Sequence, residues 1–126
     1  QFGFDKAKNP FLPHNYIPNC VAYTGSHDND TALGWYISAP GHERDFARRY
    51  LRVDGSDFAW DLIRSIWSSV AAYAVTPMQD ALSLGTEARM SFPAKLGGNW
   101  EWRLREEDMS AELAGKFKAL NELYLR

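Results

Sequence analysis

The densest group of side chains that could carry out chemistry lies in residues 24–31. It holds His27, Asp28, Asn29 and Asp30 in succession. An imidazole, two carboxylates and an amide can bind sugar hydroxyls, and a carboxylate can stabilise positive charge that develops at an anomeric carbon. The same residue types are common in loops that cap helices, where Asp side chains accept hydrogen bonds from backbone N–H groups. The residue types alone therefore leave two interpretations open, a sugar site and a capping loop.

Short apolar segments precede the polar loops of this chain. Residues 20–24 form a β-prone, nearly continuous apolar run, which is typical of a strand buried on both faces in a parallel sheet. A second such run covers residues 73–76 and stops at Pro77, and residues 1–4 resemble the end of another strand. Strands followed by polar loops and helices indicate βα units and an α/β fold. In (β/α)8 barrels, catalytic residues lie where strands end and such loops begin.

Helical periodicity and capping residues predict the helices between these strands. Asp30 or Thr31 can cap a short helix that reaches residue 36, and residues 43–51 form a second. Ser56 is expected to cap the most strongly amphipathic helix, and Ser110 a terminal helix that reaches about residue 125. A brief helical turn over residues 79–84 should end at Gly85. The apolar face of the most amphipathic helix comprises Phe58, Leu62, Ile63, Ile66, Trp67, Val70 and Ala71.

Composition excludes several classes of function. With 126 residues, 45% of them hydrophobic, and a formal net charge of -2, the chain has the composition of one globular domain. Its Lys and Arg residues form no basic stripe, so we expect no nucleic-acid partner. No apolar run approaches the roughly 20 residues that span a bilayer, so we expect no membrane partner. The single cysteine, Cys20, favours a reducing, cytoplasmic setting. Because Gln1 and not Met opens the chain, we expect these residues to come from inside a longer protein.

Metal and serine-nucleophile chemistry do not fit the sequence. The three histidines, His14, His27 and His42, match no compact ligand spacing, and Cys20 stands apart from them. Ser26 lacks the Gly-x-Ser-x-Gly frame of a nucleophile elbow. We therefore expect no metal site, no cofactor and no serine hydrolase activity.

Separate motifs in a fixed order give the chain a family resemblance. They are Leu12-Pro-His-Asn-Tyr, then Tyr23-Thr-Gly-Ser-His-Asp-Asn-Asp-Thr, then Pro77-Met-Gln-Asp-Ala-Leu with Leu84-Gly-Thr-Glu-Ala-Arg-Met, and last Gly98-Asn-Trp-Glu-Trp-Arg. Together they resemble the region around the seventh and eighth barrel strands of the 4-alpha-glucanotransferases, or amylomaltases, of glycoside hydrolase family 77. The resemblance covers most of residues 1–103.

The resemblance implies both a fold and a reaction. Residues 1–126 would be the C-terminal portion, about the last three strands with their helices, of a (β/α)8 barrel of the α-amylase clan type. The reaction would transfer α-1,4-glucan segments between malto-oligosaccharides by a retaining mechanism with an aspartate nucleophile, a glutamate acid/base and a third carboxylate. Asp28 resembles the third carboxylate, the transition-state stabiliser, and His27 would donate a hydrogen bond to the sugar at the cleavage point. The nucleophile and acid/base would precede Gln1, so the expected partners are the N-terminal part of the same enzyme and an α-1,4-glucan, and this chain alone should be inactive.

Other residues are candidates for substrate binding. We expect Asn29, Gln79, Asp80 and Trp100 to contact the glucan, although Gln79 and Asp80 could instead serve the N-terminus of a helix. In an extended segment Trp100 and Trp102 would share one face, as sugar-stacking residues do, and packing in the core is the alternative.

Two further predictions concern pairing and function. Arg89 and Glu87 are predicted to pair structurally. A glucan-binding module without catalysis and a hydrolase of the α-amylase clan remain alternative functions.

Overall fold

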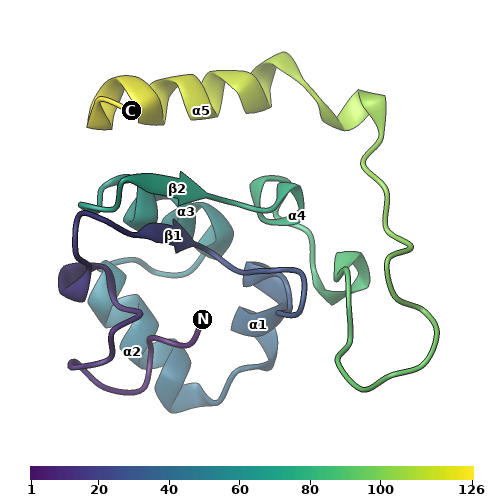
Figure 1. The fold of residues 1–126 in the computed structure, drawn as a ribbon, viewed down its shortest axis with the longest axis horizontal. Helices are drawn as coiled ribbons and strands as arrows, with labels where there is room; N and C mark the ends of the chain where they lie inside the picture. The colour runs from purple at the N-terminus through teal and green to yellow at the C-terminus, as the bar shows by residue number, and fades with distance from the viewer.

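Two short strands and the helices around them make up most of the structure, a computed structural model that describes all residues 1–126 (Figure 1). The elements in chain order are η1 (Pro13–Asn15), β1 (Val21–Tyr23), α1 (Ala32–Ser38), α2 (Gly41–Leu51), α3 (Phe58–Trp67), β2 (Tyr73–Val75), α4 (Met78–Ala81), η2 (Thr86–Ala88), η3 (Glu106–Asp108) and α5 (Ala111–Tyr124). None of the helices is long and apolar enough to cross a membrane.

The strands β1 and β2 pair in parallel, with Ala22 opposite Ala74. Because α1, α2 and α3 connect them, the predicted βα organisation is confirmed. The structure has two strands and not about three: residues 2–5 form a turn, and the apolar Phe4 packs into the core from that turn.

The sheet is buried on one face and open on the other. Ala22 packs with Ile66 and Ala71 on the α3 side. The exposed residues of the strands are Val21, Tyr23, Tyr73 and Val75. The prediction that residues 20–24 are buried on both faces is therefore wrong within this chain, because nothing in residues 1–126 covers the second face.

The main core lies where α1, α2 and α3 meet. Phe58, at the start of α3, is 1% exposed, and its ring stacks on Tyr36 at a centroid distance of 4.1 Å. Its cluster also contains Phe4 and Leu12, which fixes the segment that precedes β1. Burial of these large side chains supplies most of the hydrophobic stabilisation of this half of the chain.

The caps agree with the sequence at some helices and not at others. Thr31 Oγ1 accepts from Gly34 N at 3.0 Å, and Ser110 Oγ accepts from Leu113 N at 3.1 Å, so both predicted caps are confirmed. Ser56 does not cap α3: Asp57 precedes that helix and makes no side-chain capping bond.

The ends of α3 and α4 also differ from the prediction. The helix α3 ends at Trp67, so Val70 falls outside it and is exposed. After α4, Ser83 and not Gly85 takes the left-handed conformation, with φ 53°.

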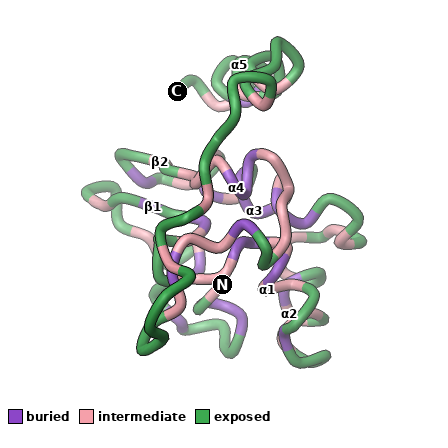
Figure 2. The backbone as a smooth tube through the Cα atoms, turned by 90° about the vertical axis from the view of Figure 1, so that its right-hand side faces the viewer, coloured by how far each residue is buried: buried purple, intermediate pink, exposed green.

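The terminal helix α5 packs on α3 (Figures 1 and 2). The ring of Phe117 contacts both Trp60 and Trp67, at centroid distances of 5.1 and 5.5 Å. Trp67 Nε1 donates to Asn121 Oδ1 at 2.9 Å. In Figure 2 a largely exposed stretch of chain leads to this helix. Beside the aromatic contacts, Arg126 at its C-terminal end donates to the backbone oxygens of Trp67, Ser69 and Ala71 and so helps to hold α5 against the rest.

Candidate functional site

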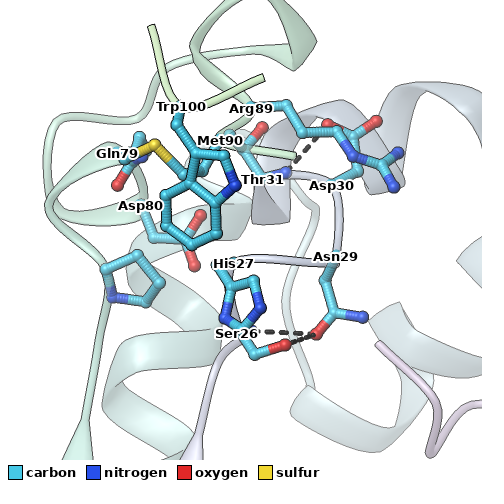
Figure 3. Close-up of a pocket in the computed structure, with 11 residues that line it drawn as sticks. Ser26, His27, Asn29, Asp30, Thr31, Gln79, Asp80, Arg89, Met90 and Trp100 are labelled. Carbon is cyan, nitrogen blue, oxygen red and sulfur yellow. Dashed lines mark hydrogen bonds between the residues drawn. The ribbon is translucent and has the colours of Figure 1, made fainter. Parts of the chain in front are cut away.

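A cavity of about 160 Å³ opens beyond the C-terminal ends of both strands (Figure 3). Its lining comes from three segments: the loop after β1, the start of α4 after β2, and the later stretch of residues 89–100. The 11 residues are Ser26, His27, Asn29, Asp30, Thr31, Pro77, Gln79, Asp80, Arg89, Met90 and Trp100. The sequence predicted this location, since parallel strands bring the loops at their C-terminal ends together.

Local hydrogen bonds shape the loop after β1. Asn29 Oδ1 accepts from Ser26 N at 2.8 Å and from Ser26 Oγ at 3.0 Å. Asn29 N in turn donates to Ser26 O at 3.1 Å. Asn29 lines the cavity, but its side-chain oxygen Oδ1 already accepts the bonds from Ser26. The side-chain NH2 group is therefore the part of Asn29 that can donate to a ligand.

His27 and Asp28 stand out from this turn. The distance between His27 Nε2 and Asp28 Oδ2 is 3.4 Å, and each side chain is 54% exposed. His27 lines the cavity, whereas Asp28 is not one of the lining residues and adjoins the cavity through its contact with His27. Both side chains are therefore accessible to a ligand, and the carboxylate lies where it can orient the imidazole.

Trp100 covers His27 from the opposite side of the cavity (Figure 3). The ring centroids are 5.0 Å apart, the planes are inclined by 35°, and Trp100 as a whole stays 54% exposed. Trp100 has φ 63°, a left-handed conformation that is rare for a residue with a side chain, and its N–H donates to Met90 O at 2.7 Å. The segment is thus not extended: Trp102 lines a different cavity, and the predictions of a shared face and of core packing for Trp100 are wrong.

Asp80 is the buried carboxylate of the site. It is 1% exposed; its Oδ2 accepts from Thr24 Oγ1 at 2.5 Å and its Oδ1 accepts from Ala32 N at 2.7 Å. Burial raises the pKa of Asp80, while these two hydrogen bonds act to lower it. Gln79, beside it, donates to Ala88 O at 3.3 Å. Both residues border the cavity, but Asp80 has its two oxygens engaged within the protein.

The chain after α4 holds the loop after β1 at two further points. Thr86 Oγ1 donates to Asp30 Oδ2 at 2.8 Å. Arg89 donates from Nη2 to Asp28 O and from Nε to Ser91 O, both at 2.8 Å. Arg89 therefore does not pair with Glu87 as predicted: Glu87 Oε1 instead accepts from Gly85 N. Sequence reasoning missed Thr86 as a site residue, because nothing in its neighbours indicates a partner 56 positions away.

The donor set at this site suits neutral, hydroxyl-rich ligands. Across residues 1–126, no group of three or more His, Cys, Asp and Glu side chains could hold a metal ion. An open indole face, an imidazole, an amide and an exposed carboxylate instead supply a stacking surface and hydrogen-bond partners for hydroxyl groups. Such a combination can bind a sugar ring and place negative charge beside it.

Comparisons with known proteins agree with one another. The family model described as 4-alpha-glucanotransferase matches residues 1–110. The 4-alpha-glucanotransferase of Clostridium butyricum is 45% identical over 99% of this chain and 26% of its own length, and that of Thermus thermophilus is 47% identical over 97% and 26%. An amylomaltase from Streptococcus agalactiae, solved in complex with acarbose, superposes with a TM-score of 0.92 at 32% identity over 99% of this chain and 26% of its own. The chain thus spans about a quarter of the length of these relatives.

Proposed function

The chain belongs to the 4-alpha-glucanotransferase family, glycoside hydrolase family 77, and from this membership we propose that it supplies part of the active site of a 4-alpha-glucanotransferase. The activity is transfer of α-1,4-glucan segments between malto-oligosaccharides, and the substrates are malto-oligosaccharides or related α-1,4-glucans. The observation that carries this proposal is the exposed His27–Asp28 pair, 3.4 Å apart, under the open indole of Trp100 at the C-terminal ends of two parallel strands.

We propose further that residues 1–126 are the C-terminal portion of a (β/α)8 barrel. The open face of the two-stranded sheet supports this, because it presents large apolar side chains to solvent, and the two Val residues among them are of the branched kind that fills a barrel interior. Parallel sheets are normally covered on both faces. The remainder of the same enzyme would cover this face and supply the nucleophile and the acid/base.

Within this mechanism, Asp28 acts on the transition state. In a retaining transfer, positive charge builds up on the sugar ring as the glycosidic bond breaks, and a nearby carboxylate stabilises that charge more than it stabilises the neutral ground state. Asp28 is suited to this role because its carboxylate is exposed and lies 3.4 Å from His27, which lines the cavity. The effect of losing it should therefore appear mainly in kcat.

His27 and Trp100 bind and orient the sugar. Asp28 Oδ2 and the Trp100 ring flank the imidazole, which fixes the direction in which its N–H groups point. From that position His27 donates a hydrogen bond to a hydroxyl of the sugar at the cleavage point. The open indole face favours stacking of a second sugar over entry of water, which favours transfer over hydrolysis.

The test is Asp28→Asn in the full-length enzyme with maltotriose as substrate. We expect kcat to fall by about 10²–10³-fold with little change in KM, the effect typical of removing one group that stabilises transition-state charge. The matched control is Asp45→Asn, an exposed carboxylate on α2, which should leave turnover unchanged. Undiminished turnover in Asp28→Asn would refute the proposal.

Product analysis separates the alternative functions in the same experiment. Oligosaccharides both longer and shorter than maltotriose indicate transfer, whereas glucose and maltose alone indicate a hydrolase. The chain of residues 1–126 alone should not turn over maltotriose, and turnover by it would contradict the proposed need for groups outside these residues. A full-length protein that binds maltotriose without converting it would favour a binding module.

A further inference from the structure

We propose that Asp80 is a positioning residue for Asp28 and not a substrate ligand: its buried carboxylate holds both ends of the loop that carries Asp28. This inference rests on the function proposed above. It assigns a role in the reaction to a residue that lies in the protein interior and makes no contact with Asp28 itself.

The hydrogen bonds of Asp80 carry the argument. One oxygen accepts from the hydroxyl of Thr24, directly after β1, and the other accepts from the N–H of Ala32, the first residue of α1. Asp28 lies midway between Thr24 and Ala32 in the sequence. A single carboxylate thus fixes the distance between the two ends of the loop, and with it the space that the loop can occupy.

The same part of the chain fixes the middle of the loop. Thr86 binds the Asp30 carboxylate and Arg89 binds the backbone carbonyl of Asp28. Arg89 is itself held by its bond to Ser91 O and by the Phe92 ring, 4.7 Å from its guanidinium carbon. With both ends and the centre attached to the segment after β2, Asp28 has little freedom to shift relative to the cavity.

The burial of Asp80 argues against the simpler roles. A substrate ligand must present an oxygen to the cavity, whereas Asp80 is only 1% exposed and each of its oxygens already accepts a bond from the protein. A purely structural role is a poor reason to bury a carboxylate, because desolvation of a charge is unfavourable. No Lys, Arg or His side chain forms an ion pair with Asp80 within residues 1–126 that would offset that desolvation.

Loosening the loop should affect the reaction more than binding. Catalytic groups act within narrow geometric limits, and a misplacement of about 1 Å can lower the rate by about 10²-fold. Asp28 interacts with charge that appears in the transition state, so its displacement lowers kcat. The stacking of sugars on Trp100 is not affected, so KM should change little.

The experiment combines three variants in the full-length enzyme. Asp80→Asn keeps the shape of the side chain but leaves a single oxygen acceptor; Thr24→Val removes the hydroxyl donor at the β1 end; Asp28→Asn removes the group to be positioned. We expect Asp80→Asn and Thr24→Val each to lower kcat for maltotriose by about 10- to 100-fold, with KM changed by less than about 3-fold. Thr24→Ser, which restores the hydroxyl, should recover most of the lost kcat.

The decisive measurement is Asp80→Asn in the Asp28→Asn background. If Asp80 acts through Asp28, the second substitution should lower kcat by less than about 3-fold once Asp28 has been removed, because the two effects are not independent. An effect of Asp80→Asn that stays the same in both backgrounds would overturn the positioning role. A raised KM with unchanged kcat in Asp80→Asn, together with wild-type behaviour of Thr24→Val, would overturn it in favour of substrate binding.

Failure of the inference and failure of the proposed function give different results. If Asp28→Asn abolishes turnover while Asp80→Asn and Thr24→Val retain kcat, only the positioning role is wrong. If Asp28→Asn leaves turnover intact, the proposed function is wrong and the positioning role falls with it. Thermal unfolding midpoints close to wild type for Thr24→Val and Asp80→Asn show that a fall in kcat reflects the loop and not the global fold.

Discussion

Gly34 offers a substitution for which local and tertiary effects have opposite signs. It lies inside α1, where alanine is normally more favourable than glycine by about 1 kcal/mol. In the structure, however, a Cβ atom at Gly34 would lie 2.5 Å from Thr86 Oγ1 and 2.6 Å from Asp30 Oδ1. These two side chains are hydrogen-bonded to each other at 2.8 Å, directly over the glycine.

The expected result of Gly34→Ala is a net loss of stability of about 1–3 kcal/mol. Inserting a methyl group into a filled space costs about 1–3 kcal/mol. Breaking the partly exposed Thr86–Asp30 hydrogen bond costs about 1 kcal/mol more, and the gain in helix propensity offsets about 1 kcal/mol. Because Asp30 belongs to the loop that carries Asp28, turnover by the full-length enzyme should fall as well.

The measurement is the urea or thermal unfolding midpoint of the full-length protein, compared with Gly115→Ala. Gly115 lies in α5 and has no atom within 4 Å of an added Cβ, so only the propensity gain applies there. The midpoint should fall for Gly34→Ala and rise for Gly115→Ala. If both substitutions raise the midpoint equally, the close approach of Thr86 and Asp30 to α1 is wrong, and so is the fixation of the loop derived from it.

Two other predictions concern the core and the buried carboxylate. Phe58→Ala should lower the free energy of unfolding by about 3–5 kcal/mol, since it removes a fully buried ring that stacks on Tyr36. Leu123→Ala, on the exposed side of α5, should change the free energy of unfolding by less than about 0.5 kcal/mol. Similar losses for both variants in denaturant unfolding would contradict the assigned core. Burial raises the pKa of Asp80 above the usual Asp value, the hydrogen bonds from Ala32 and Thr24 oppose this, and Asp30 reinforces it. Asp80 therefore adds stability below the ordinary Asp pKa and loses that contribution as pH rises through the raised pKa, so the unfolding midpoint of wild type should fall relative to Asp80→Asn over this interval. A difference between the two that does not vary with pH would show that this carboxyl titrates alike in the folded and unfolded chain.

Local features of the fold could be predicted from the sequence. Thr31 and Ser110 were identifiable as caps because their side chains act on N–H groups three residues ahead, within one helical turn. The spacing of Phe58, Leu62, Ile63 and Ile66 predicted the buried face of α3 for a similar reason. The position of the His27–Asp28 pair could also be predicted from the sequence, since residues directly after a parallel strand lie at its C-terminal end.

Long-range contacts could not be predicted in this way. For Asp80 the sequence leaves substrate binding and a role at a helix N-terminus open, and it does not indicate the two hydrogen-bond partners, which lie 56 and 48 positions earlier. Trp100 and Trp102 would share a face only in an extended segment, and the bond from Trp100 N to Met90 O accompanies a left-handed backbone conformation at Trp100 instead. Residues 1–4 resemble a strand in sequence because they are apolar and aromatic. The structure shows that Phe4 packs into the core from a turn, and a core contact of this kind does not require a strand.

The hydrogen bonds between the two βα loops limit how this chain could be recombined with its relatives. Each contact joins a residue near β1 to one after β2: Thr24 with Asp80, Asp30 with Thr86, and Asp28 with Arg89. A chimaera whose crossover falls between α1 and α4 takes one partner of each hydrogen bond from one parent and the other partner from the second parent. Such hybrids would keep the loop in place only where both parents carry the same pairs, so residues 24–32 and 80–89 should be exchanged as one unit.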